Sequence, residues 1–134
     1  MTRWLHRLPA LVGILLALPA PAQDAAAGAA LYSRFCATCH GVEGRGDGPT
    51  AAVISVPPVD LGGLAAANGG VFPVARVLRR IDGRDEVLAH GSPMPIYGAF
   101  FEAGRKVPVP TDEGEMFVTL PVLAIVRYLE TLQR

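Results

Sequence analysis

The sequence is short of several features that mark common classes of small protein. Its 134 residues include two cysteines, too few for the dense disulfide framework of a small secreted scaffold. The formal net charge is zero, charged residues make up 18%, and there is no basic run, so the positive footprint of a nucleic-acid binder is missing. An apolar content of 51% excludes a disordered chain, and the length fits one small domain.

Long apolar runs are also scarce, and the longest lies at the N-terminus. Two arginines precede the run Leu8–Leu18, and Ala20-Pro21-Ala22 supplies small residues before a cut, which is the three-part pattern of a secretory signal. We expect residues 1–22 to be a cleaved signal peptide and residues 23–134 to form an exported, periplasmic domain. Cleavage would remove two of the 12 basic residues and none of the 12 acidic residues, so the net charge of the mature chain would be 10 − 12 = −2. The alternative is an uncleaved anchor, although the run is shorter than the roughly 20 residues that span a bilayer.

The sequence of the mature part predicts a small, mostly helical domain. Apolar residues at helical spacing predict one helix that ends at His40, a short one in the middle and a clear terminal one. Weak alternation on both sides of a turn predicts a short hairpin, and glycine- and proline-rich stretches predict loops. The expected helices are 24–40, 74–81 and 121–132 with one more turn at 85–89, the hairpin is 107–118, and the irregular segments are 41–49, 51–70 and 91–98.

The strongest motif is Cys36-Ala37-Thr38-Cys39-His40. On a helix, positions i, i+3 and i+4 share a face. Two thiols on that face can add to the two vinyl groups of a haem, and the adjacent histidine then lies under the iron, which is the signature of c-type haem attachment. A redox dithiol usually opens a helix that follows a strand, a structural zinc needs four ligands, and a plain disulfide gives no reason for the histidine.

His40 would supply one axial ligand of the iron, and the other side needs a thioether, a second imidazole or an open position. The mature chain offers Met94, Met116 and His90. Met94 is favoured because prolines on both sides stiffen the loop that would present its sulfur. The competing interpretation of a methionine is core filler, for which a site between two prolines is poor because the backbone cannot adjust.

These motifs resemble the single-haem class I cytochromes c of bacteria over nearly all of residues 25–133. The resemblance rests on CATCH at 36–40, the following GVEGRGDGP, the SPMPIYG loop and the terminal AIVRYLETL. It implies an all-α cytochrome c fold, with N- and C-terminal helices crossing over a covalent haem and here a short β-hairpin near 106–118. Gly28 and Tyr32 match the family's residues on the first helix where the two helices cross, and Tyr128 and Leu129 match those on the last helix.

The resemblance also implies site roles and a function. Cys36 and Cys39 would hold the haem, His40 and Met94 would ligate the iron, and the carbonyl of Pro49 would accept the ring N–H of His40. The expected wall of the site is apolar, with arginines near 76–84 beside the haem propionates or on a solvated helix face. Its expected members are Leu31, Phe35, Val53, Ile54, Leu61, Val77, Leu78, Ile81, Ile96, Tyr97 and Leu129.

Such a site predicts a one-electron carrier rather than an enzyme. Its redox partners would be a donor dehydrogenase or cytochrome complex and an acceptor oxidase or reductase. A weakly acidic surface predicts no strong salt-dependent docking to acidic partners. No nucleic-acid partner is expected. The protein would contact a membrane only if its N-terminal segment were retained. The alternatives are a haem enzyme or gas sensor with a labile sixth ligand, and an interaction module without haem. The connection of about 26 residues from Met94 to the last helix is longer than usual for the family, which leaves the choice of partner open.

Overall fold

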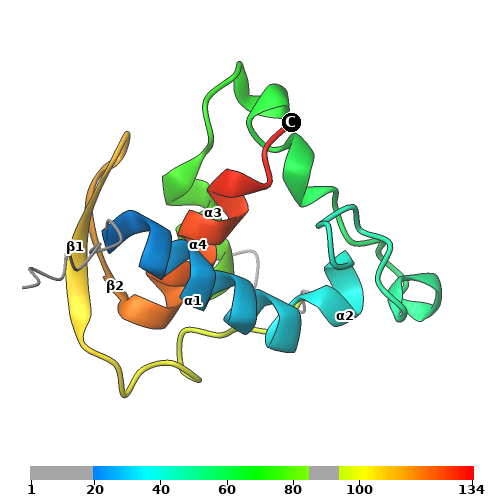
Figure 1. The fold of residues 1–134 in the computed structure, drawn as a ribbon, viewed down its shortest axis with the longest axis horizontal. Helices are drawn as coiled ribbons and strands as arrows, with labels where there is room; N and C mark the ends of the chain where they lie inside the picture. Colours follow the sequence, from blue (N-terminus) through cyan, green and yellow to red (C-terminus); the bar gives the residue numbers. More distant parts are fainter. Residues whose placement is uncertain (1–19, 85–93) are drawn as a thin grey trace, which may run out of the picture.

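A computed structural model describes residues 20–84 and 94–134 (Figure 1). Residues 1–19 of the expected signal, the expected turn at 85–89 and His90 lie outside the described residues. Among the residues that are described, no helix is long and apolar enough to cross a membrane. The elements in chain order are α1 (Ala20–Phe35), α2 (Ala37–His40), the short 3₁₀ turns Ala51–Val53, Leu61–Gly63 and Ala66–Asn68, α3 (Val74–Asp82), β1 (Lys106–Thr111), β2 (Gly114–Thr119) and α4 (Leu120–Thr131).

The two longest helices, α1 and α4, pack across each other at Gly28. A methyl group on Gly28 would lie 1.9 Å from the carbonyl oxygen of Ala124 and 2.9 Å from Cβ of Tyr128, so only glycine permits this approach. One turn further along α1, the ring of Tyr32 lies 5.2 Å from the ring of Tyr128. The crossing expected from the sequence at Gly28, Tyr32 and Tyr128 is therefore confirmed.

The expected single helix over 24–40 is wrong in one respect, because the helix is interrupted at Cys36. Cys36 has φ −117° and ψ −37°, and its φ lies well outside the α-helical value. Its amide still bonds to the carbonyl of Tyr32 at 2.8 Å, and α2 restarts with the amides of Cys39 and His40 both bonding to the carbonyl of Cys36. Helical periodicity in the sequence continues across this break, so it gave no sign of the interruption.

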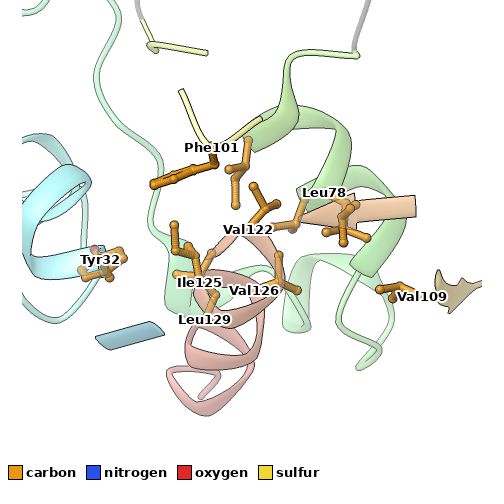
Figure 2. Packing of buried hydrophobic residues seen from close by; sticks show 11 residues of the cluster. Tyr32, Leu78, Phe101, Val109, Val122, Ile125, Val126 and Leu129 are labelled. Carbon is orange, nitrogen blue, oxygen red and sulfur yellow. The ribbon is translucent and has the colours of Figure 1, made fainter. Parts of the chain in front are cut away.

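The core is built around α4. Val122, Ile125, Val126 and Leu129 are each at most 3% exposed, and they recur at the helical spacing that defines one buried face (Figure 2). Other elements bury their apolar side chains against this face. These are Tyr32 from α1, Val77, Leu78 and Ile81 from α3, Phe101, and Val109 and Val118 from the hairpin.

The hairpin β1–β2 closes one end of the molecule, opposite α2 (Figure 1). Its register pairs Val107 with Val118 and Val109 with Met116. Val109 and Val118 are buried in the core, while Pro108, Pro110 and Phe117 beside them are exposed. The expected hairpin is confirmed, one residue longer at each end, because its alternating valines cover the core beside α3 and α4.

Candidate functional site

A cavity of about 370 Å³ opens between the end of α1, α2, α3, α4 and the loop that follows α2. That volume is within the range of small-molecule and cofactor sites. Its wall is mainly apolar and includes sulfur and nitrogen side chains from the CATCH motif. The residues that line it are Tyr32, Phe35, Cys36, Cys39, His40, Ile54, Val56, Pro57, Pro58, Val59, Leu61, Leu64, Arg76, Val77, Arg80, Ile81, Met94, Pro95, Tyr97, Ile125 and Leu129.

The two thiols of the motif line this cavity as free, half-buried cysteines. Burial raises the pKa of the Cys36 thiol to about 11, and the nearby Cys39 adds to the rise. The hydroxyl of Thr50 donates to the carbonyl of Thr38 at 2.8 Å and lies 3.3 Å from the sulfur of Cys39. Both sulfur atoms therefore face one space, where each could bond to one vinyl group of the same haem.

The loop after α2 folds back onto the motif and holds it in place. The amide of Gly46 bonds to the carbonyl of His40 at 2.8 Å, and the amide of Gly48 to the carbonyl of Cys39 at 3.1 Å. A side chain on Gly48 would lie 2.4 Å from the carbonyl oxygen of Thr38 and 2.6 Å from that of Cys39. The glycine-rich sequence therefore brings this loop against the backbone of the two residues that carry the second thiol and the imidazole.

The imidazole of His40 is oriented by the backbone of Val59. Nδ1 of His40 lies 3.3 Å from the carbonyl oxygen of Val59, and because a carbonyl only accepts, Nδ1 carries the proton. Nε2 is then the nitrogen with a free lone pair, on a side chain that lines the cavity. Burial lowers the pKa of His40, and the hydrogen bond to Val59 opposes that shift.

The expected partner of His40 was the carbonyl of Pro49, and the structure corrects it to Val59. Pro49 is exposed and is no part of the cavity wall. The reason is the path of the chain beyond Pro49. The amide of Leu61 bonds to the carbonyl of Gly44 at 2.7 Å, and this brings the carbonyl of Val59 beside the imidazole of His40.

Met94 is half-buried and lines the cavity together with Cys36, Cys39 and His40. The segment that carries it is anchored on two elements. The amide of Tyr97 bonds to the carbonyl of Ile81 on α3 at 3.0 Å, and its hydroxyl donates to the carbonyl of Phe35 on α1 at 2.7 Å. Met116 belongs to β2, which contributes nothing to the cavity wall. The structure thus brings Met94, and not Met116, to the motif.

The expected apolar wall is correct in part. Phe35, Ile54, Leu61, Val77, Ile81, Tyr97 and Leu129 line the cavity. Four other expected members do not, because Leu31 and Leu78 pack in the core while Val53 and Ile96 are exposed. Sequence reasoning missed the stretch Val56–Val59, although its two adjacent prolines mark a rigid extended segment that could have suggested a wall.

Sequence reasoning also missed a cluster of aromatic rings beside the cavity. Phe35, Tyr97, Phe100 and Phe101 all contact one another, with ring centroids 5.0–6.4 Å apart. The Phe100-Phe101 pair in the sequence was the available signal. The cluster joins the end of α1 to the segment behind Met94, so it fixes two parts of the cavity wall relative to each other.

Two guanidinium groups also line the cavity. Arg76 and Arg80 come from α3, and no carboxylate is among the described residues that line the cavity. The chain's own donor set therefore fits a haem: two thiols for its vinyl groups, an imidazole and a thioether for its iron, apolar walls for its ring and cationic groups for its carboxylates. Across 20–84 and 94–134, no group of three His, Cys, Asp or Glu side chains could hold a metal ion by itself.

Comparison with known proteins agrees with this assignment. The family model for cytochrome c matches residues 25–103, which is more than half of the chain and includes the motif, the glycine-rich loop, α3 and Met94. No curated protein and no solved structure matches the chain.

Proposed function

The chain belongs to the cytochrome c family, and from that premise we propose that it carries single electrons on a haem ligated by His40 and Met94. Proteins of this family bind haem c covalently, typically one per domain, and serve haem-based electron transfer between redox partners. The observation that carries the proposal is that Cys36, Cys39, His40 and Met94, which span 59 sequence positions, line one cavity.

In this proposal Cys36 and Cys39 form the two thioether bonds to the haem, and His40 supplies the proximal iron ligand. The carbonyl of Val59 holds the proton of His40 on Nδ1 and so presents Nε2 to the iron. A hydrogen bond of this kind also makes the imidazole a stronger donor. The bound haem supplies the redox chemistry, a one-electron change at iron, and the residues of this chain set its ligands and surroundings.

Met94 supplies the distal ligand in this proposal. A thioether ligand raises the reduction potential of haem iron, and with both axial positions filled there is no place for a substrate. Phe35, Ile81 and Leu129 line the same cavity and exclude water, which favours the less charged, reduced state in the same direction. These properties suit an electron carrier better than a haem enzyme or a gas sensor.

We further propose that the protein works in the periplasm, as a bacterial respiratory or dehydrogenase-linked carrier. The support is the N-terminal pattern of two arginines, an apolar run and small residues before residue 23. Its partners would be a donor dehydrogenase or cytochrome complex and an acceptor oxidase or reductase. Sequencing of the purified protein from its N-terminus should begin at Gln23, and a start at Met1 would replace this proposal with a membrane anchor.

The axial ligand is tested by replacing Met94 with Ala and, as a matched control, Met116 with Ala. The oxidised wild-type protein should be low-spin, with a sulfur-to-iron charge-transfer band at the red end of its spectrum, and the reduced protein should not bind carbon monoxide. Met94→Ala should abolish the sulfur band and admit carbon monoxide, because the thioether is lost. Met116→Ala should keep both properties, because β2 lies away from the cavity.

Survival of the sulfur band in Met94→Ala would show that another residue ligates the iron. Rapid carbon monoxide binding by the wild-type protein would instead favour the haem enzyme or gas sensor. A colourless wild-type protein after expression with a c-haem maturation system would refute haem binding altogether.

A further inference from the structure

The segment that follows α4 lies against the 3₁₀ turn Leu61–Gly63 (Figure 1). The side-chain amide of Gln133 bonds on both sides of this turn. Its Nε2 donates to the carbonyl of Leu61 at 2.9 Å, and its Oε1 accepts the amide N–H of Ala65 at 2.8 Å. The same Nε2 donates to the carbonyl of Leu129 at 2.8 Å, which fixes the side chain to α4. One half-buried glutamine therefore joins α4 to both sides of the turn.

Arg134 makes further contacts with the same part of the chain. Its backbone amide bonds to the carbonyl of Gly62 at 3.1 Å, and one guanidinium nitrogen lies 2.7 and 2.8 Å from the two carboxylate oxygens of Asp60. That carboxylate also accepts the amide N–H of Gly62 at 2.9 Å, so it caps the turn that it ties to Arg134. A methyl group on Gly62 would collide with the guanidinium group, so the turn and Arg134 are in direct contact. Residues 60–65 are thus held by the two residues beyond α4.

The carbonyl of Val59 lies directly before this held segment, and it needs such support. It accepts the Nδ1–H of His40 at 3.3 Å on a part of the surface that is open to water. Bonds of this kind are usually about 2.9–3.0 Å long, so this bond holds its two groups weakly. The chain on either side must therefore set where the carbonyl lies. Before Val59 the pair Pro57-Pro58 stiffens the chain, and after it residues 60–65 are tied to the segment beyond α4.

The held segment begins one peptide bond after the carbonyl that orients the proximal ligand. Resting on the proposed function, we propose that Gln133 and Arg134 are positioning residues for His40: by fixing residues 60–65 they keep the carbonyl of Val59 on Nδ1, and so keep Nε2 directed at the iron. Neither residue touches the haem in this proposal. They act through the hydrogen bond that holds the imidazole ring and makes its other nitrogen a stronger donor.

Gln133 should contribute more than Arg134. Loss of the glutamine amide removes the partner of the Leu61 carbonyl and of the Ala65 amide, and unpaired backbone groups in a partly buried site are costly. The pair of Arg134 and Asp60 is more open to water, with side chains 39% and 50% exposed, and exposed ion pairs contribute little. The two substitutions should therefore act in the same direction with different size.

The test follows the Nδ1–H proton of His40 by NMR in the reduced, diamagnetic holoprotein. In the wild type this proton should show nuclear Overhauser contacts to Val59 and Asp60, because the carbonyl between them accepts it. Gln133→Leu should move its resonance upfield, weaken these contacts and speed its exchange with water roughly 10-fold. Arg134→Gln should produce the same changes to a smaller extent.

Two further variants separate hydrogen bonding from packing and from the stability of α4. Gln133→Glu keeps the shape of the side chain, but its carboxylate cannot donate and would face the two carbonyl oxygens that accept from Nε2. It should disturb the His40 signal at least as much as Gln133→Leu. Thr131→Val removes a side-chain hydrogen bond on the last turn of α4 without touching residues 60–65, and it should leave the signal unchanged.

An unchanged His40 signal in a low-spin Gln133→Leu protein, or in Arg134→Gln if Gln133→Leu does not fold, would overturn this inference and leave the proposed function standing. Wild-type behaviour of Gln133→Glu would overturn it too, because the effect would then come from packing. So would an equal disturbance in Thr131→Val, which would assign the effect to the stability of α4. A wild-type protein that attaches no haem would overturn the proposed function as well.

Discussion

Gly28→Ala should destabilise the protein by separating α1 from α4. The added methyl would lie 1.9 Å from the carbonyl oxygen of Ala124, 2.6 Å from its carbon and 2.9 Å from Cβ of Tyr128. Real Cβ atoms essentially never approach a neighbour closer than 3.0 Å, so the helices must move apart by at least about 1.1 Å. Two of the three neighbouring atoms are backbone, so no change of rotamer relieves the contact.

The expected size of the effect follows from two opposing contributions. Overpacking of a close contact costs roughly 1–3 kcal/mol, and the upper end applies where backbone must move. Alanine gains about 1 kcal/mol over glycine in a helix interior. The free energy of unfolding should therefore fall by about 2 kcal/mol. Because Ile125 and Leu129 of α4 line the cavity, the same movement should admit water and lower the reduction potential.

The assay is urea unfolding of the oxidised holoprotein followed by circular dichroism, together with a redox titration. Gly63→Ala is the matched control, because its new methyl would meet nothing closer than 4.0 Å and Gly63 has an ordinary φ. The control should stay within about 0.5 kcal/mol of the wild type. If Gly28→Ala were as stable as Gly63→Ala, with an unchanged potential, the close crossing of α1 and α4 and its role in covering the cavity would both be refuted.

Two further predictions concern single hydrogen bonds. Tyr32→Phe removes the hydrogen bond of 2.7 Å from the hydroxyl to the buried carbonyl of Gly41. Because that oxygen is left unpaired, the free energy of unfolding measured in urea should fall by about 1–3 kcal/mol. An unchanged free energy of unfolding would mean that water replaces the hydroxyl. The hydrogen bond from Arg79 lowers the pKa of Glu113, so the stabilisation by this pair is present above the ordinary pKa of a glutamate and is lost as the pH falls through the lowered value. An NMR titration should show the pKa of Glu113 rising in Arg79→Gln, and an unchanged value would show that the pair does not form in solution.

Most of the architecture was predictable from local patterns. The stripe of Val122, Ile125, Val126 and Leu129 predicts a buried helix face, and α4 buries it. Alternation around Thr111–Gly114 predicts the hairpin, whose register follows from its short turn. Helical and strand periods are properties of the backbone itself, so they can be read without knowing what packs against each element.

The interruption at Cys36 was not predictable in the same way. The residues on both sides of it keep helical spacing, but the glycine-rich loop bonds back onto the backbone of residues 38–40 and positions α2 separately from α1. The family model likewise ends at residue 103, before the hairpin and α4. The folded chain shows how close the expected crossing is, because a methyl group on Gly28 would lie 1.9 Å from the carbonyl oxygen of Ala124 on α4.

For the site, too, some features follow from local sequence patterns and others only from the folded chain. The sequence by itself was sufficient to find the CATCH motif and to expect Met94 rather than Met116 beside it, because spacing on one helix turn and flanking prolines are local properties. Tertiary structure alone decided that Val59 and not Pro49 accepts the His40 proton, and that Arg76 and Arg80, but not Arg79, face the cavity. The physical reason is that these partners meet across a folded loop or a packed helix, where the path of the intervening chain, rather than spacing along it, sets the contact.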